Sequence, residues 1–338
     1  MRALMDYWRT SYDWRAHERE LNHFHHYRAT VDGVGLHFIH ERSAGPKPLP
    51  LLLIHGWPGS VYEFSWVIPM LTDPARFGGD PADAFDVIAP SLPGYGFSDP
   101  PRERGFNIQR MADLFVRLMD LLGYARFVAQ GGDWGAVIAS YMGYAHPDRL
   151  LGIHLNMLGV APHPEDRVDP PLSPVEQAFL KEAEAFQRDE TGYQWIQGTR
   201  PQTLAYGLND SPVGLAAWLV EKFRAWTDCD GDVERRLSKD RMLTLITIYW
   251  VTQTINSSMR LYYEVRHHPW RLKKGERIRV PTGFAAFPKE IVHPPREWAE
   301  RVYNVVRWIA MPAGGHFAAM EEPEALVREI HAFARELR

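Results

Sequence analysis

The chain has 338 residues, of which 45% are hydrophobic and 24% are charged, and its formal net charge is −4. This composition is typical of a folded globular protein, and the lack of a polybasic block argues against nucleic acid as a partner. A single cysteine, Cys229, excludes an internal disulfide and favours a reducing compartment, so we expect a cytoplasmic protein. Residues 1–20 are charged and aromatic, unlike a signal peptide.

The most apolar long run extends from Met242 to Ile255 and contains several threonines and a glutamine. It is too short to span a bilayer, so we expect a buried helix and no membrane anchor.

Short strands and helices alternate over the first half of the chain, after a polar and aromatic helical lead-in at residues 1–24. The alternating stretch around Asp32-Gly33 is typical of a β-hairpin. Apolar runs that end in glycine predict strands that are buried on both faces. These strands are expected within residues 49–56, 85–94 and 125–132, with helices at 107–123 and 134–146 and a further strand at 150–158.

The alternation stops near residue 160 at a proline-rich linker, and from Ser173 to about Trp270 every pattern is helical. Strands are again expected at 277–288 and 304–312, before a final helix at 322–337. This order predicts an α/β fold with a mostly parallel sheet, and a helical cap over its carboxyl edge, where open α/β folds bind ligands. The predicted divisions are a lead-in (1–24), a first core part (25–159), a helical cap (160–272) and a second core part (273–338).

One short motif points to chemistry. Asp133 lies in "GGDWG", between a predicted buried strand and a predicted helix, which is the setting of a strained nucleophile turn. The alternative interpretation is that Asp133 only caps the helix. An ionised carboxylate needs no base to activate it, and its attack on an sp3 carbon forms an ester that water can open, whereas serine would form an inert ether. The motif therefore predicts alkyl transfer, with an epoxide or an alkyl halide as the electrophile.

Hydrolysis of such an ester needs an oxyanion hole and a base. The loop "HGWPGS" follows a predicted strand, so we expect the backbone N–H groups of Trp57 and Trp134 to be the donors; a plain tight turn is the alternative. His316 lies in a glycine-rich loop between the last strand and the last helix, where the base is expected. As its orienting acid we favour Glu290 over three carboxylates of the proline-rich linker, namely Glu165, Asp166 and Asp169.

With these motifs in place, the chain resembles the epoxide hydrolases of the α/β-hydrolase fold, and among them the microsomal and juvenile hormone branch. The resemblance covers nearly the whole chain and is most specific in the cap segment "LNDSPVGLAAW", supported by "HGWPGS", "QGGDWGA" and "GGHFAAMEEPE". It implies Asp133 as the nucleophile, His316 as the base and Glu290 as its partner. Relatives usually have a longer N-terminal segment, and membrane-bound ones have an anchor before it, so the resemblance implies a shortened segment here.

The resemblance also implies two cap tyrosines over the epoxide oxygen. They are Tyr193 and Tyr262, with the adjacent Tyr263 as the fallback and as a further substrate contact beside Trp57 and Trp134. The departing oxygen becomes a strong base, and phenols can donate hydrogen bonds and a proton to it. The expected reaction converts an apolar or aryl epoxide and water to a vicinal diol.

Three other functions fit parts of the sequence. A haloalkane dehalogenase would share the aspartate nucleophile and Trp134, but a halide leaving group needs indole N–H donors and not phenols. A ligand-binding homologue that has lost turnover would lack the nucleophile or the base. The histidines of "HFHH" (His23 to His26) lack a paired Glu-His helix or cysteines, so we expect no metal and no cofactor. The choice between monomer and homodimer stays open.

Overall fold

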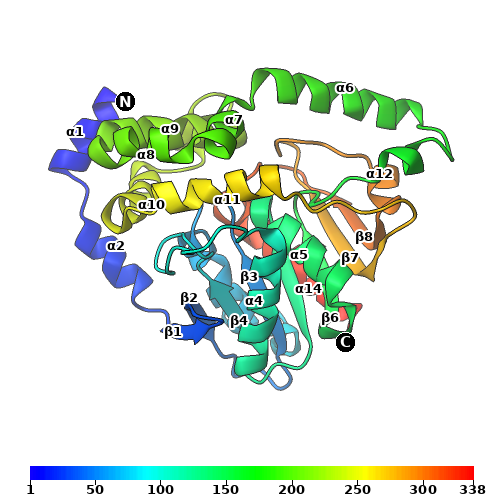
Figure 1. The fold of residues 1–338 in the computed structure, drawn as a ribbon. Helices are drawn as coiled ribbons and strands as arrows, with labels where there is room; N and C mark the ends of the chain where they lie inside the picture. Colours follow the sequence, from blue (N-terminus) through cyan, green and yellow to red (C-terminus); the bar gives the residue numbers. More distant parts are fainter.

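The structure is a computed structural model that describes residues 1–338, and an eight-stranded sheet lies at its centre (Figure 1). The strand order is β1-β2-β4-β3-β5-β6-β7-β8. Strand β2 pairs antiparallel with both β1 and β4, and all other pairs are parallel. The predicted α/β-hydrolase fold with a mostly parallel sheet is therefore confirmed. The strands are β1 (His26–Val31), β2 (Val34–Glu41), β3 (Leu49–Ile54), β4 (Phe85–Pro90), β5 (Phe127–Gly131), β6 (Leu150–Leu155), β7 (Ile278–Ala286) and β8 (Tyr303–Ala310).

Helices cover both faces of the sheet because its central strands bury both faces. In β3, Leu52 and Ile54 belong to the hydrophobic cluster under α4 and α5, whereas Leu51 and Leu53 belong to the cluster under α3 and α14. The core helices are α3 (Val67–Thr72), α4 (Ile108–Leu121), α5 (Asp133–Ala145), α12 (Arg296–Glu300), α13 (Ala318–Glu321) and α14 (Pro323–Arg335).

Six helices between β6 and β7 form the cap, above the sheet in Figure 1. The two N-terminal helices pack on its α10, where Tyr7 donates a hydrogen bond to Asp240. The helices are α1 (Arg2–Thr10), α2 (Trp14–Leu21), α6 (Pro174–Asp189), α7 (Gly192–Thr199), α8 (Pro201–Asp210), α9 (Pro212–Trp226), α10 (Lys239–Thr252) and α11 (Ile255–His267).

The apolar run from Met242 to Ile255 is helical and largely buried, but it is not one helix. The helix α10 ends at Thr252 because Gln253 adopts a left-handed φ of 55°, and α11 begins at Ile255. No helix of the chain is both long enough and apolar enough to cross a membrane.

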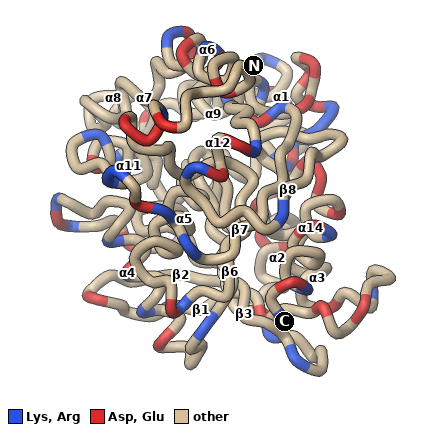
Figure 2. The backbone as a smooth tube through the Cα atoms, turned by 90° about the vertical axis from the view of Figure 1, so that its right-hand side faces the viewer, with Lys and Arg blue, Asp and Glu red and all other residues tan.

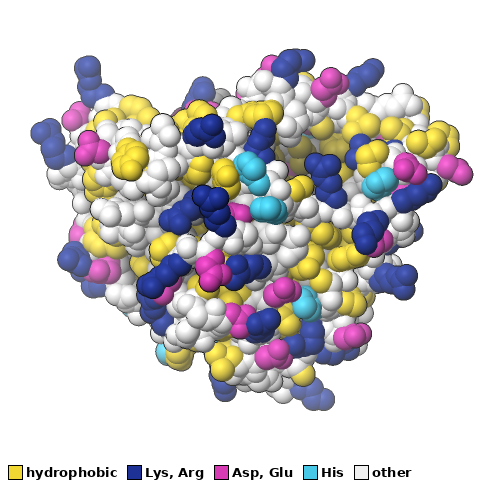
Figure 3. Space-filling view, viewed as in Figure 1, with side chains coloured by type: hydrophobic (Ala, Val, Ile, Leu, Met, Phe, Trp, Pro, Cys, Tyr) yellow, Lys and Arg dark blue, Asp and Glu magenta, His cyan; other side chains and the backbone are white.

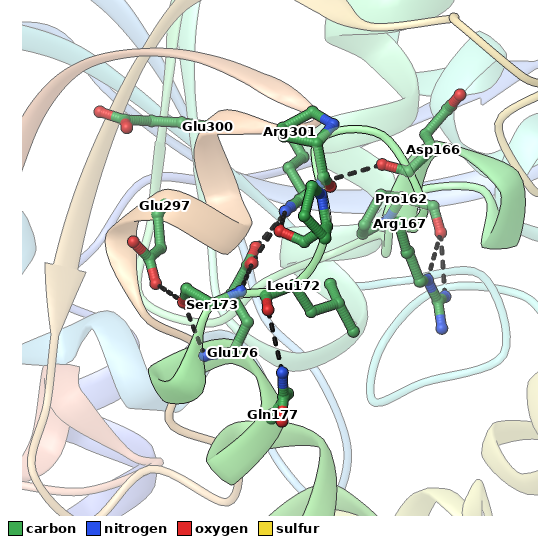
Figure 4. Close-up of polar contacts among 12 residues, drawn as sticks. Pro162, Asp166, Arg167, Leu172, Ser173, Glu176, Gln177, Glu297, Glu300 and Arg301 are labelled. Carbon is green, nitrogen blue, oxygen red and sulfur yellow. Dashed lines mark hydrogen bonds and ion pairs between the residues drawn. The ribbon is translucent and has the colours of Figure 1, made fainter.

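Arg301, at the end of α12, fastens the proline-rich linker and the start of α6 to the core (Figure 4). Its guanidinium donates to the carbonyl oxygens of Asp166 and Pro170, each at 3.0 Å, and to both carboxylate oxygens of Glu176. Glu176 also completes a capping box with Ser173 at the start of α6. The linker is therefore held by backbone and side-chain bonds to one arginine.

Figure 2 shows Lys and Arg interspersed with Asp and Glu along the backbone, without a block of one sign. On the face in Figure 3, a hollow lies below α6 with hydrophobic side chains at its rim. A cavity of about 400 Å³ lies where the linker at 159–164 meets residues 270–272, which follow α11.

Candidate active site

Asp133 is the first residue of α5 and lies in the sharp turn that follows β5. Its φ is +48°, a left-handed conformation that is uncommon for residues other than glycine. A Cβ atom on Gly131 would lie 2.3 Å from the carbonyl carbon of Gly135, and one on Gly135 would lie 1.9 Å from the carbonyl oxygen of Ile54. The flanking glycines are therefore required by the close approach of the backbone, as in a strained nucleophile turn.

The loop after β3 holds one oxygen of this carboxylate. The backbone N–H of Trp57 donates to Oδ1 of Asp133 at 2.8 Å. A Cβ atom on Gly56 would lie 2.2 Å from the same oxygen, so only glycine leaves room for it. The N–H of Trp134 makes no hydrogen bond to the carboxylate, so its place in an oxyanion hole stays a prediction.

The loops after β7 and β8 bring Glu290 and His316 together. Nδ1 of His316 lies 2.5 Å from Oε1 of Glu290, and its Nε2 lies 3.5 Å from Oδ2 of Asp133. Both His316 and Glu290 are buried. Burial disfavours the imidazolium, but the carboxylates of Glu290 and Asp133 outweigh it and raise the pKa of His316 well above its ordinary value. The imidazole is therefore placed to exchange a proton beside Asp133.

Two cap tyrosines cover these loops. The ring of Tyr193, from α7, stacks on Trp57 at 5.4 Å between centroids, and Tyr262, from α11, packs edge-on against Trp134 at 4.8 Å. The two tyrosine rings lie 5.8 Å apart. Burial, followed for Tyr193 by the charge of Asp133, raises the pKa of both phenols above the ordinary value. Both phenols are therefore protonated donors at neutral pH.

Tyr263 lies away from this group. It is only half-buried, and its ring stacks on His267 with centroids 4.0 Å apart. Two of the three linker carboxylates have partners elsewhere, and Asp169 is exposed. Glu165 pairs with Lys274, and Asp166 accepts the N–H of Gly275.

The histidines of "HGWPGS" and "HFHH" make other contacts. His55 is buried and accepts the N–H of Leu92, and burial lowers its pKa to about 4. In "HFHH", His25 pairs with Glu41, and His26 contacts His37 at 2.8 Å. No group of three or more His, Cys, Asp or Glu side chains in the chain has the arrangement of a metal site.

Sequence reasoning missed two carboxylates near His316. Glu63 lines a cavity of about 30 Å³ beside Asp133 and His316, and burial raises its pKa to about 8. It also completes a capping box with Ser60, a Ser-x-x-Glu pattern that could have drawn attention to it. Glu321 accepts the N–H groups of Asp228 and Phe317, which steadies the loop of His316, and burial raises its pKa to about 7.

Comparisons with known proteins agree with this geometry. The family model "Epoxide hydrolase N terminus" matches residues 1–64, and the "alpha/beta hydrolase fold" model matches residues 50–195. A putative epoxide hydrolase of Stigmatella aurantiaca is 48% identical, over 100% of this chain and 76% of its own length. Epoxide hydrolase 1 of Sus scrofa is 40% identical, over 98% of this chain and 79% of its own.

Solved structures give the same result. The juvenile hormone epoxide hydrolase of the silkworm Bombyx mori superposes with a TM-score of 0.89 at 34% identity, over 99% of this chain and 84% of that one. The Aspergillus niger epoxide hydrolase gives a TM-score of 0.86 at 30% identity, with the same coverage. The chain therefore belongs to the epoxide hydrolases of the α/β-hydrolase fold, in the branch that contains the microsomal and juvenile hormone enzymes.

Proposed function

We propose that this chain hydrolyses an epoxide to a vicinal diol through an ester on Asp133. The observation that carries the proposal is that the loop of Trp57, His316 and the cap residues all meet at the carboxylate of Asp133. The Asp133 carboxylate is held by the N–H of Trp57, lies 3.5 Å from Nε2 of His316, and is covered by the cap residues that pack on Trp57 and Trp134. The names of the relatives, which are epoxide hydrolases, support the reaction class.

In the first step, Asp133 attacks one epoxide carbon. Because Oδ1 accepts the N–H of Trp57, Oδ2 is the attacking oxygen. The bond between that carbon and the epoxide oxygen breaks, and the oxygen keeps the electron pair. Tyr193 and Tyr262 donate hydrogen bonds to it, and one of them transfers its proton, which leaves a hydroxyl on the substrate and a phenolate on the enzyme.

In the second step, His316 takes a proton from water, and the hydroxide attacks Cγ of the Asp133 ester. The N–H of Trp57 stabilises the oxyanion, and Glu290 holds the imidazolium in place. The bond between Cγ and the ester oxygen then breaks. His316 returns its proton to the departing oxygen, which completes the diol, and the proton left on the Asp133 carboxyl restores the phenol.

Indole and phenol rings surround the reacting groups, which favours an apolar or aryl epoxide as the substrate. Trp226 adds to this lining, because its ring lies 5.1 Å from that of His316 and 5.3 Å from that of Tyr193. A cytoplasmic location remains a prediction from the single cysteine.

One observation favours a second candidate, a haloalkane dehalogenase. The indole N–H groups of Trp57 and Trp134 are buried and have no hydrogen-bond partner, so they are free to bind a halide. The buried phenols favour the epoxide, because a departing halide needs no proton.

The test is a single turnover of styrene oxide in oxygen-18 water with enzyme in excess. We expect unlabelled oxygen in the first-turnover diol and the label in the peptide that contains Asp133. Label in the first-turnover diol would contradict the ester. Asp133→Asn is the control without a nucleophile. Halide release from chloroalkanes, with no diol from any epoxide, would favour the dehalogenase.

A further inference from the structure

Lys222 is a buried lysine in the cap that no step described so far uses. It lies in α9, and its side chain is 8% exposed. Its Nζ lies 4.6 Å from the ring centroid of Tyr193 and 5.5 Å from that of Trp226. Its charge partner is Glu221, whose carboxylate lies 2.6 Å from Nζ and is 56% exposed.

The partner does not explain why a lysine is buried here. Placing an ammonium group away from water is unfavourable unless other groups replace the water. The Glu221 carboxylate is largely in solvent, where its attraction is screened. The aromatic faces are the remaining compensation, since a cation is attracted to the electron-rich face of a phenol or an indole. The ammonium group of Lys222 therefore places a positive charge next to the ring of Tyr193.

The hydrogen bonding of Tyr193 also favours negative charge on its phenol oxygen. Nε2 of Gln194 donates to the phenol oxygen at 2.9 Å, so the phenol's own hydrogen is free to be donated elsewhere. An N–H at the oxygen and an ammonium over the ring both favour negative charge on this phenol. Asp133, Tyr262 and Glu221 are the other titratable groups that act on it, and the charges of Asp133 and Glu221 oppose that negative charge.

We propose that Lys222 is a positioning residue for epoxide opening, whose ammonium stabilises the negative charge that develops on Tyr193 as its proton moves to the departing oxygen. The inference rests on the proposed function, in which Tyr193 is one of the two proton donors. The bonds formed and broken are those of the first step. Lys222 exchanges no proton and acts only through its charge.

The test compares Lys222→Met with Lys222→Arg by rapid-quench measurement of ester formation from styrene oxide. We expect Lys222→Met to slow ester formation about tenfold while the half-saturating substrate concentration changes less than about twofold. Lys222→Arg keeps the charge and is expected to restore most of the rate. Loss of packing alone would not be rescued by the bulkier arginine.

Lys239→Met is the matched control. Lys239 also lies over a tyrosine ring, that of Tyr7 at 5.8 Å, and its Nζ also lies 2.6 Å from a glutamate, Glu234. It belongs to the cap but not to the site, so ester formation should not change in this variant. A similar loss in both variants would overturn the inference.

Glu221→Gln tests whether more positive charge near Tyr193 speeds ester formation, and it does so at an exposed side chain. Removing this negative charge leaves the ammonium of Lys222 uncompensated, so ester formation is expected to become faster. An unchanged or slower rate would overturn the inference even if Lys222→Met failed to fold.

Tyr193→Phe separates this inference from the proposed function. It should slow ester formation, and in its background Lys222→Met should have no further effect. A normal rate in Tyr193→Phe would contradict the proposed role of Tyr193. A slow Tyr193→Phe beside a normal Lys222→Met would overturn only the role of Lys222.

Discussion

Nε2 of His316 lies 3.5 Å from Oδ2 of Asp133, while Glu290 contacts the other nitrogen of the same ring. The imidazole therefore lies between two carboxylates, which outweigh burial and raise the pKa of His316 well above its ordinary value. In the proposed mechanism, ester formation removes the charge of Asp133. The pKa of His316 then falls, so the imidazolium releases its proton to the solvent and becomes the neutral base that takes a proton from water. It is protonated again from the solvent once the Asp133 carboxylate is restored.

His316→Gln is expected to trap the ester. Asp133 needs no base for its attack, so the covalent intermediate should form, but water is not activated and the ester should persist. Intact-mass spectrometry after incubation with styrene oxide should show an adduct with the mass of one substrate molecule. Glu290→Gln is expected to accumulate less adduct, because the base remains and only its orientation is weakened. An unmodified His316→Gln protein would contradict the role of His316 as the base of the second step.

The stability of the protein should depend on pH through His316. Its pKa is raised in the folded state above the unfolded value of about 6.5, so folding is favoured most when the group is protonated. This contribution is fully present below about pH 6.5 and is lost as the pH rises through the folded pKa. The difference in melting temperature between the wild type and His316→Gln should therefore shrink above pH 6.5. A melting-temperature difference that stays constant or grows up to pH 9 would contradict this contribution of His316 to stability.

The order of strands and helices was predictable because local patterns carry it. Strands such as β3 are buried on both faces and therefore appear as continuous apolar runs, and the capping box at Ser173 marks the start of α6. The turn at Asp133 was also predictable, because the close backbone contacts there require glycines, and these glycines are visible in the local sequence around Asp133.

Other parts of the site depend on packing that no local pattern encodes. Adjacent residues on a helix point about 100° apart, so whether Tyr262 or Tyr263 faces Trp134 depends on how α11 lies on the core. Lysine and glutamate are rarely buried, so their residue types give no reason to expect Lys222 or Glu63 beside the site. The end of α10 at Thr252 depends on the left-handed backbone of Gln253, which its residue type does not require.

The two adjacent tyrosines provide a matched pair of variants. Tyr262→Phe removes a buried phenol beside Trp134 and is expected to slow ester formation by about 100-fold, the lower end of the range for a lost proton donor, because Tyr193 remains. Tyr263→Phe removes a half-buried hydroxyl next to His267 and should leave the rate unchanged. Rapid-quench kinetics measures both. The reverse pattern would assign the role to Tyr263.

Gly56→Ala should displace the carboxylate of Asp133, the proposed nucleophile. The new Cβ atom would lie 2.2 Å from Oδ1 of Asp133, so the carboxylate or the loop must move. A shift of about 1 Å at a reacting group costs about 100-fold in rate, and kcat is expected to fall by this factor. Gly207→Ala in α8 is the control, because nothing lies within 4 Å of its Cβ position. It should keep full activity and stabilise the fold by about 0.5 kcal/mol. Equal kcat values for both variants would contradict the steric argument.

Arg301→Met should destabilise the protein through the linker. The Glu176 carboxylate is 1% exposed, and without Arg301 it would lose its charge partner, while the carbonyl oxygens of Asp166 and Pro170 would lose their donor. Breaking a deeply buried pair costs about 3–5 kcal/mol. Because the Arg301 side chain is itself 11% exposed, we expect about 2–3 kcal/mol in urea unfolding.

The double variant Arg301→Met/Glu176→Gln separates the unpaired charge from the lost bonds. It removes the uncompensated carboxylate, so it should be more stable than Arg301→Met alone. Asp189→Asn breaks an exposed pair with Arg188 on the same helix α6 and should leave the unfolding midpoint unchanged. If Arg301→Met unfolds at the same urea concentration as Asp189→Asn, the Arg301 contacts do not stabilise the fold. Since Arg301 joins α12 of the core to the start of α6, its loss should also expose the linker at 161–173 to proteolysis before the rest of the chain.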